Sequence, residues 1–263
     1  MRRMKTFYLV DGHAHIFRAY YAPFGSVLNA PSGEPTKATY VFTQMILNIL
    51  KDQKPDYFAV TLDAGDETTE RREFFPEYKA NREAAPDDFG PQVTRIMEIL
   101  DLLDIPTFMV RGHEADDLIA TIAKRVADED VELRVMSKDK DLYQILTDKV
   151  VLWDPSEGLT MNPEKLADKH GYTPEQAVEI QTLTGDSTDN VPGVPGIGPK
   201  KAAALIQKYG SVDGVVEHVE ELTPKMRERV AEHELFDVTR RLVTLKDDVD
   251  FPFALEALSL IHI

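Results

Sequence analysis

Short apolar runs alternate with longer amphipathic segments over the first half of the chain. The predicted strands are runs rich in β-branched and aromatic side chains, at residues 6–10, 57–62, 107–110, 133–136 and, more weakly, 150–153. The predicted helices have apolar side chains at helical spacing, at residues 14–21, 38–50, 91–103 and 115–126. Strands that alternate with helices in this way form a mainly parallel central sheet with helices on both faces, so we predict an α/β fold.

After residue 153 the pattern predicts helices only. Residues 163–170 and 174–184 each begin with a proline, which is common in the first turn of a helix. A run rich in glycine and proline at residues 191–201 then leads into a predicted helix at 202–209. The chain therefore combines a sheet-containing first part with a helical second part.

Acidic side chains follow the predicted strands. Asp11, Asp63 and Asp139 come at or just after three of them, and Glu114-Ala115-Asp116-Asp117 opens a predicted helix. Because the carboxyl ends of parallel strands meet at one edge of a sheet, we expect these acids to lie on one rim. Burying like charges together costs several kcal/mol unless a cation compensates. Taken alone, the acidic run could equally be an ordinary first helical turn that the helix dipole stabilises.

Two further segments could contact a polyanion. The run from Pro195 to Lys201 fits neither the Walker nor the dinucleotide fingerprint, but a glycine-rich hairpin between helices can bring backbone N–H groups to a phosphate. The alternative is a tight turn in which glycine allows positive φ. The insert at residues 64–90 interleaves cations with aromatic side chains, which suits a flexible single strand. Its alternative is a solvated loop with a small apolar cluster.

Composition narrows the classes of protein. The chain has no cysteine, which excludes disulfides, thiolate zinc sites and cysteine nucleophiles and fits a reducing compartment. No apolar run is long enough for a signal peptide or a membrane span, so we predict a cytoplasmic protein without a membrane role. The net charge of −16 argues against a nucleic-acid partner, unless the acids cluster around bound cations.

Seven motifs in this order resemble the bacterial 5′-nuclease family, the relatives of flap endonucleases found as the N-terminal domain of DNA polymerase I or as free-standing enzymes. They are Val10-Asp11-Gly12, Leu62-Asp63-Ala64, Tyr78-Lys79-Ala80-Asn81-Arg82, Glu114-Ala115-Asp116-Asp117, Asp139-Lys140-Asp141-Leu142-Tyr143-Gln144, Gly185-Asp186-Ser187-Thr188-Asp189-Asn190 and Pro195-Gly196-Ile197-Gly198. The resemblance implies a PIN-like nuclease core at residues 1–176, with the insert 64–90 as a helical arch. It also implies a helix-hairpin-helix duplex-binding region at 177–250 and a tail at 251–263. Residues 258–263 do not match the family's continuation, and we leave them out of the fold prediction.

The resemblance also implies a site with two divalent ions, Mg²⁺ or Mn²⁺, in a shell of oxygen ligands. The acids implied for the first ion are Asp11, Asp63, Glu114 and Asp116, and those for the second are Asp117, Asp139, Asp141, Asp186 and Asp189. Lys79 and Arg82 match arch residues that grip the scissile phosphate, with Arg71 and Tyr78 as helpers. The implied duplex contacts are Gly196, Gly198, Lys200 and Lys201, with a K⁺ ion at the hairpin.

From the resemblance we predict a metal-dependent, structure-specific 5′ nuclease that leaves a 5′-phosphate and a 3′-hydroxyl. Its substrates would be branched, flapped or nicked duplex DNA and RNA–DNA primers, and a DNA polymerase in cis or in trans would be its partner. Three alternatives stay open: a DNA-junction binder that has lost its metals, a related metal-dependent ribonuclease, and a phosphatase acting on small molecules.

Overall fold

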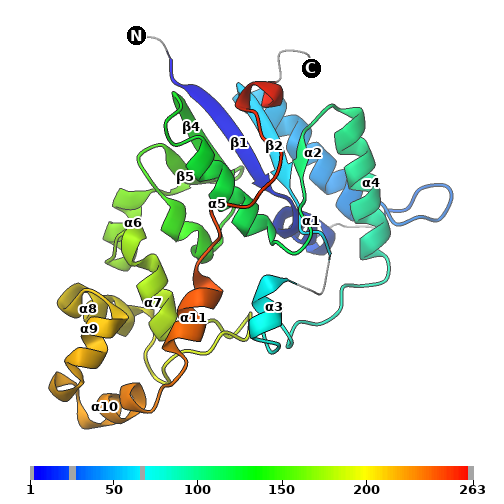
Figure 1. Ribbon diagram of the computed structural model, residues 1–263. Coiled ribbons are helices and arrows are strands. Elements are labelled where there is room, and N and C mark those ends of the chain that lie inside the picture. The colour runs from blue at the N-terminus through cyan, green and yellow to red at the C-terminus, as the bar shows by residue number, and fades with distance from the viewer. Residues whose placement is uncertain (1–2, 24–27, 66–68, 260–263) are drawn as a thin grey trace.

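The computed structural model describes residues 3–23, 28–65 and 69–259, and a six-stranded sheet forms its centre (Figure 1). The strand order is β3-β2-β1-β4-β5-β6. The strands are β1 (Lys5–Asp11), β2 (Tyr57–Thr61), β3 (Thr107–Phe108), β4 (Val131–Met136), β5 (Val150–Asp154) and β6 (Gly158–Met161). All neighbours pair in parallel except β5 and β6, so the predicted mainly parallel sheet is confirmed. The prediction of helices only after residue 153 was wrong, because β6 forms a short hairpin with β5.

The central strand β1 explains why both faces of the sheet are covered. Phe7 pairs with Tyr57 of β2 on one side and with Leu133 of β4 on the other. Phe7 and Leu9 belong to one apolar cluster and Tyr8 and Val10 to a second, as expected where successive side chains point to opposite faces. A shift of β1 by one residue would exchange the side chains between the two faces and disrupt both clusters. The packing therefore fixes the register of β1 and with it the position of Asp11 at the end of the strand.

Helices divide between the two faces of the sheet. The face of Tyr8 and Val10 is covered by α1 (Gly12–Tyr21), α2 (Lys37–Gln53) and α4 (Phe89–Leu102). The face of Phe7 and Leu9 is covered by α5 (Ala115–Arg125), α6 (Pro163–His170) and α7 (Ala177–Thr184). Short 3₁₀ turns η1 (Lys140–Ile145) and η2 (Pro174–Gln176) connect these elements. The predicted α/β architecture is therefore confirmed.

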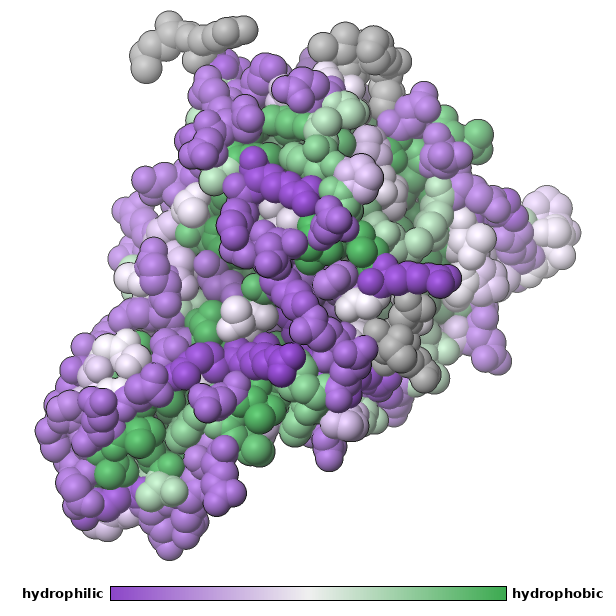
Figure 2. All heavy atoms as spheres, in the orientation of Figure 1, coloured by the Kyte–Doolittle hydropathy of each residue, from purple (hydrophilic) through white to green (hydrophobic). Residues whose placement is uncertain are grey.

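The helical second part continues from α7. It comprises α8 (Pro199–Tyr209), α9 (Val212–Glu217), η3 (Val219–Glu221), α10 (Pro224–Ala231) and α11 (Phe236–Val243). Ile197 and Ile206 belong to the same apolar cluster as Phe7, so the helical part packs continuously onto the core. In Figure 1, α8, α9 and α10 lie at one end of the molecule, and α11 returns toward the sheet. Figure 2, in the same orientation, shows hydrophilic side chains over most of the visible surface.

Two predictions about connecting segments need correction. Within the described part of the insert 64–90, the only helix that precedes α4 is α3 (Glu70–Phe74), so the predicted helical arch is mostly turns. The tail is part of the fold: Leu258 in η4 (Leu255–Leu258) is buried, and Ser259 pairs with Tyr57. Leaving residues 258 and 259 out was wrong, and residues 260–263 lie outside the described part. Among the described residues, no helix has the length and apolar character to cross a membrane.

Candidate active site

The acids predicted at the strand ends meet at the carboxyl edge of the sheet. Asp11 ends β1, where its carboxylate accepts from the backbone N–H of Ala14 at 3.3 Å and from Ser137 Oγ at 3.0 Å. Asp63 follows β2 and accepts from the backbone N–H of Ala115 at 2.8 Å. This last hydrogen bond ties the end of β2 to the first turn of α5, which carries Glu114 and Asp116. The parallel topology thus brings together acids far apart in the sequence.

Mutual repulsion among these carboxylates is strong. Burial and then the charges of Asp63 and Asp139 together raise the pKa of Asp11 to about 7, against the hydrogen bonds from Ser137 and Ala14 that lower it. Desolvation, followed by the charges of Asp11, Asp139 and Asp63, raises the pKa of Asp116 well above its ordinary value. Asp11 and Asp116, whose ionisation is disfavoured by burial and by the neighbouring carboxylates, form a site of concentrated negative potential, where a cation would be bound favourably.

A second group of acids lies beside the first. Burial raises the pKa of Asp141 to about 7, with the charge of Asp139 as the next cause, and its Oδ1 accepts from Gln181 Nε2 at 2.5 Å. Asp186 pairs instead with Lys140 at 2.7 Å, and this contact lowers its pKa although burial alone would raise it. Part of this second group is therefore neutralised by a side chain of the protein itself.

Cations from the insert face the acids across a pocket of about 320 Å³ lined by Asp63, Lys79, Arg82 and Glu114 among others. Lys79 Nζ lies 2.7 Å from Glu114 Oε2 and 3.7 Å from Asp189. Arg82 donates to Asp189 from Nε at 3.0 Å. Lys79 has φ of 56°, and its backbone N–H donates to the carbonyl oxygen of Asp189 at 2.8 Å. Such a strained backbone conformation in a non-glycine residue is typical of functional sites.

Three predicted site residues are placed differently from their predicted roles. Asp117 is 1% exposed, and both its carboxylate oxygens accept from Arg71, at 2.7 and 2.8 Å, so it is not available as a metal ligand. Arg71 is buried by the same contact and cannot reach DNA. Tyr78 is 5% exposed and its hydroxyl donates to Glu114 at 3.1 Å, so its ring is not free to stack on a base. These contacts favour a supporting role for each of the three residues.

The glycine-rich hairpin has the predicted form. Gly196 has φ of 80°, and Gly198 directly precedes the first turn of α8, with Lys200 and Lys201 exposed beside it. Lys201 Nζ donates to the carbonyl oxygen of Gly196 at 3.0 Å, and Arg229 donates to that of Pro195 at 2.8 Å. The positive φ of Gly196 explains the preference for glycine there, and the guanidinium of Arg229 lies where a Cβ would be placed.

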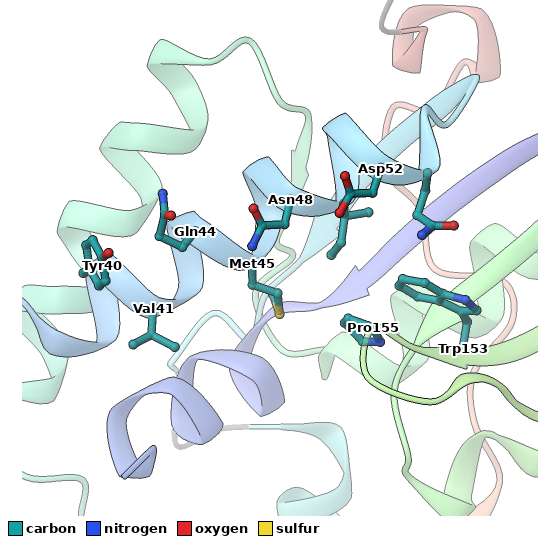
Figure 3. Close-up of a pocket in the computed structure, with 10 residues that line it drawn as sticks. Tyr40, Val41, Gln44, Met45, Asn48, Asp52, Trp153 and Pro155 are labelled. Carbon is teal, nitrogen blue, oxygen red and sulfur yellow. The ribbon is translucent and has the colours of Figure 1, made fainter. Parts of the chain in front are cut away.

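A larger pocket, of about 530 Å³, lies elsewhere, between α2 and the segment after β5 (Figure 3). Its lining includes Tyr40, Met45, Asn48 and Trp153, and it contains none of the predicted site residues. It also lacks any concentration of like charge, since Asp52 is the one carboxylate in its lining and no lysine or arginine lines it. We place the site at the smaller pocket because two acids of the rim, Asp63 and Glu114, line it together with Lys79 and Arg82.

The acids of the site could supply some, but not all, of the ligands of a metal ion. The acids offer oxygen ligands, which suit Mg²⁺ or Mn²⁺. Within the described residues, no three acidic, histidine or cysteine side chains are arranged closely enough to hold an ion by themselves. The donor set therefore fits a hard divalent cation that takes the rest of its shell from water or from substrate oxygens.

Several supporting side chains were missed at the level of sequence. Ser137 Oγ donates to Asp11 and accepts from the backbone N–H of Asp139 at 3.1 Å, and His13 Nδ1 accepts from the backbone N–H of Asp63 at 3.0 Å. Lys140 and Gln181 hold acids of the second group. Ser137 and Lys140 could have been suspected from their position next to Asp139, whereas Gln181 had no signal beyond its place in a predicted helix.

Family models match almost the whole chain. The family model for the N-terminal resolvase-like domain of 5′-3′ exonucleases matches residues 6–171, and that for their C-terminal SAM fold matches residues 172–263. The second match runs through the tail, which also contradicts the prediction that residues 258–263 depart from the family.

Relatives and solved structures cover most of the chain. A 5′-3′ exonuclease of Aquifex aeolicus is 34% identical over 257 residues, which is 98% of this chain and 87% of that protein. The thermostable DNA polymerase I of Thermus thermophilus is 39% identical over 242 residues, which is 92% of this chain but 28% of the polymerase. The chain therefore spans less than a third of that polymerase. The structure of T5 5′-exonuclease with bound zinc ions has a TM-score of 0.77 and 26% identity, covering 92% of this chain and 90% of that one.

Proposed function

This chain belongs to the 5′-3′ exonuclease family, and on that premise we propose that it is a 5′ nuclease of branched DNA. It would hydrolyse phosphodiester bonds at 5′ flaps and nicks, in DNA and in RNA primers, and leave a 5′-phosphate and a 3′-hydroxyl. The observation that carries the proposal is the rim of acids at the carboxyl edge of the sheet. Burial and neighbouring carboxylates raise the pKa of Asp11 and Asp116 there, and two further acids of the rim, Asp63 and Glu114, line one pocket with Lys79 and Arg82.

The acids proposed to hold two divalent ions, Mg²⁺ or Mn²⁺, are Asp11, Asp63, Glu114, Asp116, Asp139, Asp141, Asp186 and Asp189. A pair of such ions, when bound, activates water and stabilises the charge that develops at the scissile phosphate. The K⁺ ion predicted at the hairpin is left out of the proposal. In the structure, the carbonyl oxygens of Pro195 and Gly196 accept from the side chains of Arg229 and Lys201.

Lys79 and Arg82 are proposed to hold the scissile phosphate. In the structure they neutralise Glu114 and Asp189, which are proposed metal ligands. When those carboxylates bind cations instead, the ammonium of Lys79 and the guanidinium of Arg82 are left to pair with a substrate phosphate in the same pocket. Arg82 offers the planar fork that suits phosphate, whereas Lys79 acts as a point charge.

Cleavage of a labelled 5′-flap duplex tests the proposal. With Mg²⁺, the unchanged protein should release the flap. Lys79→Ala removes a cation at the scissile phosphate and Asp139→Asn removes a carboxylate proposed to bind metal, so each should lower kcat by about 100-fold or more. Lys124→Ala is the matched control. Lys124 is an exposed lysine on the last turn of α5, away from the acids, and its side chain pairs with Asp247. Tight binding of the flap by the unchanged protein without any cleavage would favour the junction binder instead.

Duplex binding through the hairpin is expected to depend steeply on salt. Lys200→Ala and Lys201→Ala should each weaken binding and reduce the slope of log K against log[salt] by about 0.9, the value for one lost phosphate contact. Lys208→Ala is the control, because Lys208 lies at the other end of α8 and pairs with Glu221 at 2.9 Å. Equal slopes for all of these variants would remove the hairpin from the proposed interface.

The remaining alternatives are separated by substrate. A ribonuclease would cleave single-stranded RNA at least as fast as a flap and would not need Lys200 and Lys201. A small-molecule phosphatase would release phosphate from a monoester and leave the flap intact. A polymerase partner is proposed from the relatives that are DNA polymerases I, and the cytoplasmic location stays a prediction.

A further inference from the structure

We propose that Arg71 and Asp117, which the sequence had assigned to DNA and metal, form a positioning pair that holds Glu114 and Lys79 in place and ties them to the end of the helical region. The pair would act through these residues without touching substrate or metal. The inference rests on the proposed function, because it deepens the roles given there to Glu114 and Lys79.

The pair is a two-pronged ion pair in the interior. Arg71 Nη1 and Nη2 donate to Asp117 Oδ2 and Oδ1 at 2.7 and 2.8 Å, and the side chains are 9% and 1% exposed. The two residues come from different segments, the insert helix α3 and the first turn of α5. A fork of this kind fixes both the distance and the orientation between the segments, which a single contact would not do.

On the site side, the pair reaches Glu114 by three routes. Asp117 Oδ2 accepts from the backbone N–H of Glu114 at 3.3 Å, and Arg71 Nη1 lies 3.9 Å from the Glu114 carboxylate itself. The same α3 segment leads to Tyr78 and Lys79, which both donate to Glu114 Oε2, at 3.1 and 2.7 Å. Moving α3 relative to α5 would therefore displace a proposed metal ligand and a proposed phosphate-binding lysine together.

On the other side, the pair holds the end of α11. Arg71 donates to the carbonyl oxygens of Leu242 at 2.8 Å and Thr244 at 3.1 Å, and Asp117 Oδ1 accepts from the backbone N–H of Lys246 at 2.9 Å. In Figure 1, α3 lies beside α11 near the carboxyl edge of the sheet. Because α11 follows the helices proposed to bind duplex, the pair links that region to the acids.

Stability alone does not account for the pair. Burying two charges costs about as much as their attraction returns, so a buried ion pair is weak evidence for a stabilising role, whereas removal of one partner is strongly destabilising. Five polar groups from two segments, Glu114 and residues 242–246, meet on this pair. A fully hydrogen-bonded pair of this kind instead fixes α3 and α5 relative to one another.

A double variant separates positioning from stability. Arg71→Met strands the Asp117 charge and should lower the melting temperature, and Arg71→Met with Asp117→Asn should restore most of it, because no buried charge is left unpaired. If the pair positions the site, kcat on the flap stays lowered about 10- to 100-fold in the double variant, as for other supporting contacts. KM should change less than threefold, the half-saturating Mg²⁺ concentration should rise about tenfold, and amide exchange at residues 78–82 should be faster.

Arg125→Met is the matched control. Arg125 lies at the opposite end of α5 and donates to the carbonyl oxygens of Phe251 and Val249, both at 2.8 Å, so it ties the same helix to the same C-terminal segment away from the acids. It should lower the melting temperature and leave kcat within twofold. Arg71→Lys keeps the charge without the fork, and should lower kcat at a nearly unchanged melting temperature.

Two results would overturn the inference: recovery of kcat together with stability in the double variant, or unchanged amide exchange at residues 78–82. An unchanged protein that fails to cleave flaps would instead count against the proposed function. The exchange measurement needs no activity and would still decide whether the pair positions this segment.

Discussion

Asp116→Asn is expected to lower flap cleavage by about 1,000-fold and, at the same time, to raise the melting temperature of the metal-free protein. The loss of rate follows because Asp116 lies at the centre of the proposed metal-binding acids, and the charge it contributes there is needed to hold cations at the scissile phosphate. The gain in stability follows because Asp116 is repelled by Asp11, Asp139 and Asp63. Each kcal/mol of repulsion relieved should add about 2–4 °C.

The opposite signs make this a demanding prediction. Asp148→Asn is the matched control, since Asp148 is an exposed aspartate in the turn before β5, and it should change neither the rate nor the melting temperature appreciably. An Asp116→Asn protein that loses activity together with stability would show that the carboxylate supports the fold. A protein that keeps its activity would remove Asp116 from the site.

Mg²⁺ should stabilise the folded protein far more at pH 8 than at pH 5. The pKa of Asp11 and that of Asp141 are raised to about 7 in the fold, mainly by burial, against an ordinary value of 3.8. Between about pH 4 and pH 7 these two groups therefore hold more protons in the folded than in the unfolded state. Their contribution to the free energy of unfolding falls as pH rises through this window, and it is lowest above pH 7.

A bound cation reverses that loss where the carboxylates are ionised. At pH 8, Mg²⁺ at 100 times its Kd should add about 2.7 kcal/mol, or about 5–11 °C, and at pH 5 clearly less. Burial lowers the pKa of His15 to about 4, which acts in the opposite direction between pH 4 and 6.5, so Asp11→Asn serves as the reference. Without metal, the variant should gain stability over the unchanged protein as pH rises toward 7. Equal Mg²⁺ shifts at both pH values would contradict the assignment.

The sheet and the acidic rim could be predicted because both follow from local pattern and chain direction. Runs such as residues 6–10 are apolar on both faces, which only a covered parallel strand tolerates, and the acid after such a strand must emerge at the carboxyl edge. Asp11 and Asp63 were therefore placed correctly on this rim from spacing alone. The glycines at 196 and 198 were identified for a similar reason, since their backbone conformation is a local requirement.

The misplaced residues depend on contacts between distant segments. Asp117 directly follows Asp116 in the sequence. Its side chain nevertheless points toward Arg71, which lies 46 residues earlier in the chain. Sequence spacing gives no direction to a side chain at a loop-to-helix boundary until its partner is known. The strand β6 was missed because it has only four residues, one of them buried, and so carries little β pattern. The helical arch was what the family resemblance implied for the insert. Its packing onto Asp189 and Leu242 depends on long-range contacts that sequence spacing does not reveal.

Cleavage of a 5′-flap duplex before and after chelation tests the central claim most directly. The unchanged protein should cut the flap in Mg²⁺, stop completely when EDTA is added, and recover when Mg²⁺ is restored in excess. Cleavage that continues at the same rate in EDTA would contradict the account, because the acids at the edge of the sheet would then not act by binding a divalent cation.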